Sequence, residues 1–364
     1  MSSQPRRVWL LCSNRWNSAI TEYALSSALA LQKLGWESIF SPLASSPAAL
    51  RARQSNLQLV TFEHFGLTEA GRFRRELKRI KPDLILLFGG PETFLSRLAP
   101  GIPKLRFRGQ DADGHLPLSP LATRWSLHHC EGLITPSGFI QKRFAQVMGA
   151  KPVHCVPLGL ERSLYQLERK NFPGSLRPVL RIFGRLDPVK GHIAFFELFQ
   201  ELLAQWPTGE PQPWLEVVGQ EANLTGENLR QAASEIGLVE GRDWLLRLER
   251  VADVKALLSS THLAIIPSLS SEIICRVAEE FLMAGCPLFV SGVGSLEECL
   301  FDSTAGMSYR GLSRSDQLAA LRRWIPQSFG ETFETREVRA ARAVALFSLE
   351  QMGEQLAAAA THHL

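Results

Sequence analysis

The sequence predicts an α/β protein of two domains, each built on a doubly wound parallel sheet. Along nearly the whole chain, short apolar runs alternate with amphipathic segments of helical period, a pattern typical of strand–helix–strand units whose strands pair in parallel. The length of 364 residues also exceeds the roughly 150 residues of an average domain. A polar stretch containing Pro173, Gly174 and Pro178 interrupts the pattern, and we interpret 161–178 as a linker between domains 1–160 and 179–344.

In the first domain, the pattern predicts a β-α-β beginning at residue 7. The strands are expected at 7–12, 38–42, 57–62, 82–90, 132–135 and 152–157, with a further strand that begins at 104 and runs into a loop within 104–113. The helices are expected at 20–34, 69–80 and 139–148, the last of them capped by Ser137. Glycine or proline follows most of these segments, which supports the proposed ends.

In the second domain, the same alternation continues to the end of the chain. The strands are expected at 179–183, 214–218, 244–248, 263–267 and 288–291. The helices are expected at 192–206, 229–236, 254–259 and 336–360, with a further helix that follows Ser271 and ends before Gly285. The predicted elements again alternate strand and helix, so this half should form its own parallel sheet.

The net charge of +4 is distributed unevenly between the two halves of the chain. Residues 1–160 hold 20 Lys and Arg against 10 Asp and Glu, whereas residues 161–364 hold 20 against 26. A basic half suggests an anionic partner. Helix 69–80 is strongly basic and places Phe73, Leu77 and Ile80 on one face, so it is either an ordinary surface helix or a surface for anionic lipid.

Cysteine spacing and hydropathy exclude several classes of protein. The six cysteines form no Cys-x-x-Cys pair and lie mostly in apolar runs, which favours reduced thiols over a zinc site or a disulfide framework. No apolar run approaches the roughly 20 residues that cross a bilayer, and the run after Arg6-Arg7 is too short for a signal peptide. We therefore expect a cytoplasmic protein.

Two glutamates stand on either side of a predicted helix start. Strand 263–267 leads into a polar loop, where Ser270 and Ser271 are candidate N-caps. Glu272 lies in this loop and Glu280 about two turns into the helix, so the carboxylates lie on the order of 12 Å apart along the axis. The free amides of the helix start form a site for phosphate between them, and the carboxylates would take hydroxyl groups at both ends of a ligand.

A second loop carries the cations that a phosphate requires. Strand 179–183 runs into Gly184-Arg185-Leu186-Asp187-Pro188-Val189-Lys190-Gly191, and a helix follows. Gly184 permits close approach to the backbone, Arg185 supplies a planar fork and Lys190 a point charge. The glycine spacing of a Walker loop is missing.

These two stretches resemble GT-B glycosyltransferases, most closely the retaining family 4 of glycosyl transferases group 1. Glu272, seven residues and Glu280, followed by 283–287 (Met-Ala-Gly-Cys-Pro), resemble the family's Glu-x7-Glu motif. The 184–191 loop resembles its diphosphate element, and 292–298 resembles its glycine-rich turn, which would add amides near the phosphate. The resemblance implies two Rossmann-like domains facing a cleft, with the last helix, about 345–364, returning to the first domain.

The resemblance assigns roles to individual positions. In the family, the first Glu contacts the donor sugar, the second the ribose, and the Arg and Lys the diphosphate. The implied donor-binding residues are Gly184, Arg185, Lys190, Gly219, Arg250, Glu272, Ile273, Ile274, Cys275 and Glu280. The residues expected to act in catalysis are Glu272, Arg185, Lys190 and Arg108.

The first domain departs from the family pattern. The Gly-Gly of the first loop is absent, and Asn17 and Ser18 occupy its place. The family's His-Gly-x-Asp appears as Arg108-Gly109-Gln110-Asp111; arginine cannot act as a base, but it can stabilise charge on phosphate or acceptor. The expected acceptor-side residues are Asn17, Ser18, Gln110 and Asp111. Alternative bases are His115, His128 and His129, and Asp111 with Asp113 is an alternative metal site.

We therefore expect a glycosyltransferase that moves a hexose-type sugar from a nucleotide-diphosphate donor to a saccharide or lipid-linked acceptor, in lipopolysaccharide or other cell-envelope synthesis. Retention of anomeric configuration is implied by the resemblance. We expect neither a cofactor nor a metal requirement, and the basic first domain suggests peripheral contact with the inner membrane face. Two alternatives remain at this stage: a sugar-nucleotide epimerase of the same fold, and a non-catalytic sugar-nucleotide-binding subunit.

Overall fold

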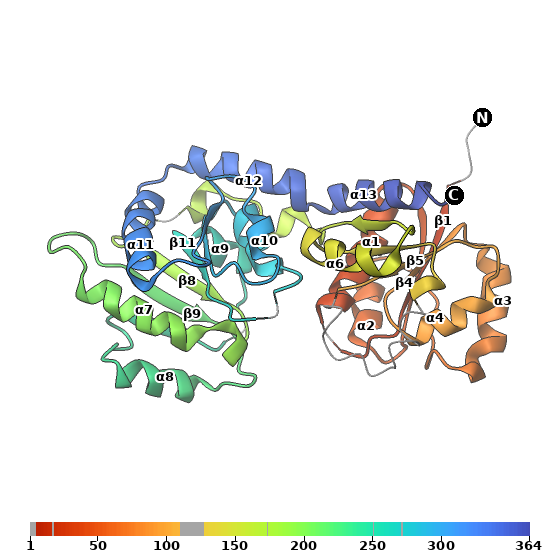
Figure 1. The fold of residues 1–364 in the computed structure, drawn as a ribbon, viewed down its shortest axis with the longest axis horizontal. Helices are drawn as coiled ribbons and strands as arrows, with labels where there is room; N and C mark the ends of the chain where they lie inside the picture. Colours follow the sequence, from red (N-terminus) through yellow and green to blue (C-terminus); the bar gives the residue numbers. More distant parts are fainter. Residues whose placement is uncertain (1–4, 17, 110–126, 173, 250, 271) are drawn as a thin grey trace. The chain divides into compact units, whose positions relative to one another are not determined.

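The computed structural model describes residues 5–16, 18–109, 127–172, 174–249, 251–270 and 272–364. Contacts divide the chain into two compact units (Figure 1). Unit 1 is Met1–Leu160 with Phe347–Leu364, and unit 2 is Glu161–Leu346. Within the described ranges, every helix is too short or too polar to span a lipid bilayer.

Unit 1 is built on a seven-stranded parallel sheet in the order β3-β2-β1-β4-β5-β6-β7, counted over the described residues. Its strands are β1 (Arg7–Cys12), β2 (Glu37–Pro42), β3 (Gln58–Leu59), β4 (Leu84–Leu87), β5 (Lys104–Phe107), β6 (Gly132–Thr135) and β7 (Val153–Cys155). Its helices are α1 (Ala19–Lys33), α2 (Pro47–Gln54), η1 (Leu67–Glu69), α3 (Ala70–Ile80), α4 (Pro91–Leu95), η2 (Ser96–Leu98), α6 (Gly138–Met148) and α13 (Leu349–Thr361). The strand order reverses between β1 and β4, which is where ligands bind in open sheets of this type.

The apolar face of α3 belongs to the core of unit 1. Phe73 is fully buried and stacks on Trp9 with 4.7 Å between ring centroids. Ile80 is also buried, and Leu77 packs against the same core. Protein therefore covers this apolar face, because burying it beneath the sheet stabilises the fold and leaves only the basic face in water.

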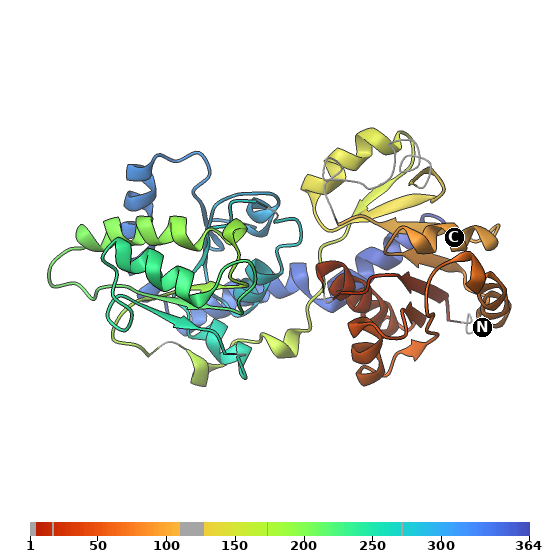
Figure 2. The ribbon, with the colours of Figure 1, turned by 90° about the horizontal axis from the view of Figure 1, so that it is seen from below.

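Unit 2 is built on a second parallel sheet, of six strands among the described residues, in the order β10-β9-β8-β11-β12-β13. Its strands are β8 (Val179–Phe183), β9 (Trp214–Val218), β10 (Trp244–Arg247), β11 (Leu263–Ile266), β12 (Leu288–Val290) and β13 (Gly306–Ser308). Its helices are η3 (Arg162–Leu164), η4 (Arg169–Asn171), η5 (Pro188–Lys190), α7 (His192–Ala204), α8 (Gly226–Glu235), α9 (Val254–Ser259), α10 (Arg276–Met283), η6 (Leu296–Cys299), α11 (Arg314–Phe329) and α12 (Phe333–Phe347). The view from below places α7 and α8 in front of this sheet (Figure 2), so these two helices cover that face of the sheet.

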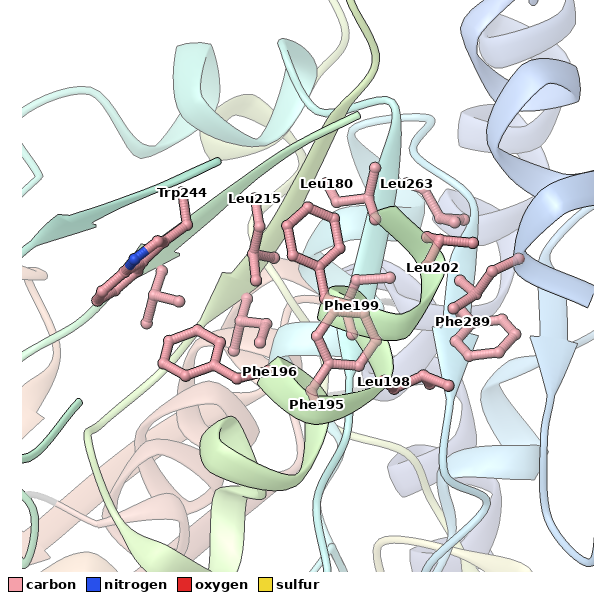
Figure 3. Close-up of a cluster of buried hydrophobic side chains, with 14 of the residues drawn as sticks. Leu180, Phe195, Phe196, Leu198, Phe199, Leu202, Leu215, Trp244, Leu263 and Phe289 are labelled. Atoms are coloured by element: carbon pink, nitrogen blue, oxygen red, sulfur yellow. The ribbon is translucent and has the colours of Figure 1, made fainter. Parts of the chain in front are cut away.

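Helix α7 supplies much of the core of unit 2. Phe195, Phe196 and Phe199 point from it toward Leu180, Leu215 and Leu263 on three neighbouring strands (Figure 3). All six side chains are at least 97% buried. Burial of each contributes roughly 1.5–3 kcal/mol, so the helix and the loop that precedes it are held firmly against the sheet.

Residues 161–178, interpreted from the sequence as a linker, are packed into unit 2. Tyr165 is buried, Glu168 forms an ion pair with Lys255, and the guanidinium of Arg336 lies over the ring of Phe172. The proline and polar residues of this segment permit an irregular backbone path. Its side chains nevertheless pack against unit 2, so the segment is part of that unit.

The expected final helix, 336–360, is two helices, α12 and α13. Ser348 adopts an extended conformation and caps α13 by accepting from the amide of Gln351. The same residue forms a parallel bridge with Leu160, whose amide donates to Phe347. Helix α13 then packs on α1, so the chain end is part of unit 1 (Figure 1).

Candidate functional site

The candidate site of unit 2 lies at the carboxyl ends of β8 and β11, which are neighbours in the sheet. The strand order reverses between them, and a crevice at such a point is the usual ligand site of an α/β sheet. The 184–191 loop leaves β8 and the 267–275 loop leaves β11. The two stretches singled out from the sequence therefore meet in the folded unit.

Two contacts fix the shape of the 184–191 loop. The carboxylate of Asp187 accepts from the amide of Val189 (3.2 Å) and from the Nδ2 of Asn223 (2.8 Å), which starts the turn η5. Gly191 follows with a φ of +72°, and a Cβ at this position would lie 2.0 Å from the carbonyl oxygen of Pro267. Only glycine fits this approach, so Lys190 is held between the two strand ends.

Lys190 and Glu272 form an ion pair across the two loops. The Nζ of Lys190 lies 2.5 Å from the Oε1 of Glu272, and the hydroxyl of Ser268 donates to the same oxygen. Glu272 is 6% exposed, so the pair compensates a carboxylate that burial alone would disfavour. Ser268 was not identified from the sequence, although its place just after β11 indicates a polar role.

Arg185 differs from Lys190 in having no partner. It is exposed and makes neither an ion pair nor a side-chain hydrogen bond with any residue that the structure describes. Its five donors are therefore available to an anion at this edge of the sheet. The site thus combines Lys190, which is paired with a carboxylate, with Arg185, which is exposed to solvent.

The glycine-rich turn after β12 holds the loop of Glu272. The amide of Ser295 donates to the carbonyl of Glu272 (2.8 Å), and its hydroxyl donates to the carbonyl of Ile273 (2.8 Å). Gly294 has a φ of +65°, and a Cβ there would lie 1.9 Å from the Glu272 carbonyl oxygen. The turn therefore positions the backbone that carries Glu272, a role that the sequence did not indicate.

Helix α10 begins later than the sequence predicted. Its N-cap is Cys275, which makes no capping bond, and the first helical residue is Arg276. Ser270 precedes this start by several residues, so it is no cap, and Ser271 is outside the described residues. The first amides of α10 therefore have no side-chain cap and remain available to an anion.

The residues between Glu272 and α10 form the lining of this loop. Ile273 and Ile274 are half-buried, whereas Cys275 is buried with its Sγ 3.3 Å from the hydroxyl of Ser295. Their burial keeps the backbone of the loop close to the helix start.

Glu280 is the fifth residue of α10, one turn nearer the helix start than predicted. It is 4% exposed, and its Oε1 accepts from the hydroxyl of Tyr165 (2.9 Å) and from the Nε of Arg276 (2.7 Å). The Arg276 contact follows from i,i+4 spacing and is readable in the sequence. Tyr165 lies in the expected linker, and nothing in its local sequence indicates this role.

Gly219 lies beside Gly184 at the ends of neighbouring strands. The amide of Gly184 donates to Val218, and the amide of Gly219 donates to Arg247, each at 3.0 Å. The structure thus gathers most of the predicted donor-binding residues at one edge of unit 2. Arg250 falls outside the described residues.

The remaining predicted site residues belong to unit 1. Ser18 caps α1 and accepts from the Nδ2 of Asn14 (2.6 Å). Arg108 follows β5, is buried, and lies over the ring of Phe144 at 5.1 Å. Burial, and to a smaller extent Arg106, lower the pKa of Arg108 to about 10. The other predicted positions, Asn17, Gln110 and Asp111, lie outside the described residues, as do Asp113 and His115.

Sequence reasoning missed Glu92, which lies beneath the first loop of unit 1. It is fully buried, and its Oε1 accepts from the amide of Ser13 (3.0 Å). Burial raises the pKa of this carboxyl. Its position just after Gly89-Gly90, at the end of β4, is the feature that would have indicated it. Elsewhere in unit 1, His128 is exposed and His129 half-buried.

Within the residues that the structure describes, no group of three or more His, Cys, Asp or Glu side chains is arranged to hold a metal ion. All six cysteines are free thiols.

Comparison with known proteins finds a family match for the part of the chain that carries the candidate site. Residues 167–337 match the protein family described as "Glycosyl transferases group 1". These residues include both loops and all of α10. No curated protein matches the chain in sequence.

Solved structures are similar over nearly the whole chain. The UDP complex of Anabaena HepE has 18% identity and a TM-score of 0.77, with 98% of this chain and 100% of that chain covered. Sucrose-phosphate synthase of Thermosynechococcus elongatus has 15% identity and a TM-score of 0.71, with 98% of each chain covered. A glycosyltransferase of Rickettsia africae has 12% identity and a TM-score of 0.75, with 99% and 98% covered. These likenesses establish the fold.

Proposed function

We propose that this chain, a glycosyltransferase of the GT-B fold with a group 1 domain in unit 2, transfers a hexose-type sugar from a nucleoside-diphosphate donor to an acceptor hydroxyl. The observation that carries the proposal is the ion pair of Lys190 with Glu272, which joins the loop of Arg185 to the loop before the uncapped start of α10. Two cations and free amides favour a diphosphate. The solved complexes of HepE with UDP and with UDP-glucose support a donor of this class.

The diphosphate would bind between Arg185 and Lys190. Lys190 has three donors and uses one on Glu272, so two remain for phosphate oxygens. Breaking the bond between sugar and diphosphate leaves negative charge on the departing nucleotide. The two fixed cations and the α10 amides stabilise that charge, which lowers the barrier because they are in place before the reaction.

The two glutamates would hold the two ends of the donor. Glu272, oriented by Lys190 and Ser268, would accept hydrogen bonds from the sugar hydroxyls. Glu280 uses its Oε1 for Tyr165 and Arg276, and its other oxygen would accept from the ribose. Both carboxylates are buried, so their bonds to hydroxyl groups are made in a medium of low dielectric constant and gain strength.

The finer chemistry is part of the same proposal. The retaining course follows from the motif resemblance, and Arg108 supplies no base for inverting attack. The charge that a divalent ion would provide is already present in Arg185, Lys190 and the helix amides, so transfer should proceed without metal. The acceptor is a saccharide or lipid-linked hydroxyl, as in envelope polysaccharide synthesis, and the basic face of α3 favours peripheral contact with an anionic membrane.

A panel of nucleoside diphosphates and their sugars, followed by thermal unfolding of the purified chain, tests the donor assignment. A cognate donor should raise the melting temperature, since it binds the folded state only. Release of free nucleotide, with and without acceptor, separates a transferase from a binding subunit. Recovery of the unchanged nucleotide attached to an epimerised sugar would instead identify an epimerase. No stabilisation by any member of the panel would refute the donor site.

Chelator and product stereochemistry test the finer claims. Activity in excess chelator should equal activity in magnesium or manganese, and restoration by metal after complete loss would contradict metal independence. The anomeric proton coupling of the product should match that of the donor, and an inverted coupling would contradict retention.

A further inference from the structure

Unit 1 contains a pocket of about 780 Å³ that the donor site does not use. It lies beyond the carboxyl ends of β4 and β5, next to the point where the strand order reverses. Most of its wall is apolar. The aromatic and aliphatic side chains on the wall include Phe65, Leu67, Phe88, Phe94, Leu98 and Phe107.

Among the residues that the structure describes, Arg108 is a buried cation without a counter-ion in this apolar wall. Arg108 lines the pocket and is 8% exposed. Its Nε and Nη2 are buried and have no hydrogen-bond partner in the described part of the chain. Its one aromatic contact, with Phe144, does not satisfy these donors. An uncompensated buried charge is costly, and such a group is retained where an anion completes it.

The charged side chains that the structure describes around Arg108 do not neutralise it. Arg106 also lines the pocket and is buried, so a second positive charge stands beside the first. Glu92 is the carboxyl close to Arg106, and its own burial favours its neutral form. In the described part of the pocket, the positive charge of Arg108 therefore stands beside an apolar wall.

The mouth of the pocket is also both apolar and positively charged. Leu67 is 90% exposed, which leaves an apolar side chain at the surface. Ala70, the first residue of α3, also lines the pocket, and α3 continues with Arg72, Arg74 and Arg75. The basic residues at the mouth attract an anion that carries an apolar group. Inside the pocket, the anion would accept hydrogen bonds from Arg108 and the apolar group would contact the wall.

We propose that this pocket binds the acceptor of the transfer reaction and that the acceptor carries a phosphate or similar oxyanion on an apolar body, with Arg108 as the anion-binding residue. The inference rests on the proposed function, because it assigns the second substrate of that reaction. A neutral saccharide would leave the Arg108 donors unsatisfied and would meet few polar side chains on the wall. A free inorganic anion would leave the apolar wall in water.

Hexyl phosphate, hexyl glucoside and inorganic phosphate are probes that separate the two properties. We expect hexyl phosphate to bind at least tenfold more tightly than either other probe, because it alone provides both anion and apolar chain. Arg108→Met should weaken hexyl phosphate by roughly tenfold or more. The same variant should raise the melting temperature of the unliganded chain, since it removes an uncompensated charge.

The controls make the result specific to this pocket. Arg53→Met removes an exposed charge from the same unit and should leave probe affinity unchanged. Leu67→Gln alters the exposed rim without touching the core, and it should weaken hexyl phosphate even if Arg108→Met does not fold. Equal affinities of the three probes, or wild-type affinity in both Arg108→Met and Leu67→Gln, would overturn the proposal.

Two further measurements show whether the anion belongs to a membrane lipid or to a soluble molecule, and whether a negative result affects this inference alone or also the proposed function. Phosphatidylcholine vesicles containing phosphatidic acid should displace hexyl phosphate if the acceptor is a membrane lipid, whereas lack of displacement assigns a soluble acceptor. Binding of nucleotide-sugar by the same preparation tests unit 2. Intact donor binding without hexyl phosphate binding would overturn this inference alone, and absent donor binding would overturn the proposed function.

Discussion

The two units place positive charge next to ligand space in opposite ways. In unit 2, Lys190 is paired with a buried glutamate, and the other cation, Arg185, is exposed to water. In unit 1, Arg108 is buried, and its Nε and Nη2 have no hydrogen-bond partner among the residues with described positions. The first arrangement is stable without a ligand, whereas the second carries an uncompensated cost until an anion arrives.

This difference predicts how substitutions in each unit should change ligand binding and stability. The unit 2 site is already organised around Glu272, so loss of any member of the pair should reduce both function and local order. The unit 1 pocket carries a destabilising group, so removing Arg108 should reduce binding but improve stability. Opposed effects of this kind are typical of functional groups that are retained at the expense of stability.

The largest expected effect is at Glu272. In Glu272→Gln the carboxylate becomes an amide, and both Lys190 and Ser268 lose a charged acceptor. We expect kcat/KM to fall roughly 10- to 100-fold, because a hydrogen bond to a charged group contributes about 1.5–3 kcal/mol. Steady-state transfer rates measure this. Glu227→Gln, at an exposed position of unit 2, is the control, and a wild-type rate for Glu272→Gln would refute the role of this carboxylate.

The next effect separates the two cations of the same site. Arg185→Ala and Lys190→Ala should each weaken donor binding by roughly tenfold or more. Only Lys190→Ala should also lower the melting temperature, since it leaves Glu272 buried without its cation. Calorimetric titration and thermal unfolding measure the two properties, with Arg323→Ala as the exposed control. Equal loss of stability in both variants would break the contrast between them.

The fold was predictable because its signals are local. Apolar runs of strand length, helices of period 3.6 and terminal glycines repeat along the chain, and they correspond to the two parallel sheets. The meeting of the 184–191 loop with Glu272 was also predictable, because both follow strands and parallel strands end at one edge. This prediction depended on identifying each segment as a strand or a helix, and it did not depend on the exact residue at which each segment ends.

The contacts that organise the site were less predictable because they join distant residues. Tyr165 reaches Glu280 from a segment whose proline and polar composition resembles a linker. Ser295 holds the Glu272 loop from 23 residues further along the chain. The amphipathic pattern of α3 identified its buried face, but the pattern alone does not say whether protein or lipid covers that face. Only the packing of Phe73 on Trp9 decides this.

A smaller effect concerns the pH dependence of unit 2. Burial, and to a lesser extent Glu280, raise the pKa of Glu279 to about 8. A carboxyl whose pKa is raised on folding contributes stability below its ordinary pKa, and this contribution is lost as the pH rises toward 8. Glu279→Gln should therefore become more stable relative to wild type between pH 5 and about 8. Chemical unfolding across this range, with Glu227→Gln as control, measures the difference, and a constant difference would show that Glu279 does not titrate there.

The smallest effect, expressed per residue, concerns contact between α3 and an anionic membrane. Because Phe73 and Ile80 are buried in the protein, α3 offers lipid only its charges. Each Lys or Arg near an anionic leaflet contributes about 1 kcal/mol, and this attraction is screened within about 3 Å at 1 M salt. Binding to anionic vesicles should therefore occur at low salt and disappear at high salt. Replacing Arg72, Arg74, Arg75 and Lys78 with Gln should abolish it, whereas Arg322→Gln with Arg323→Gln in unit 2 should not. Binding that survives high salt would require an apolar surface other than this helix.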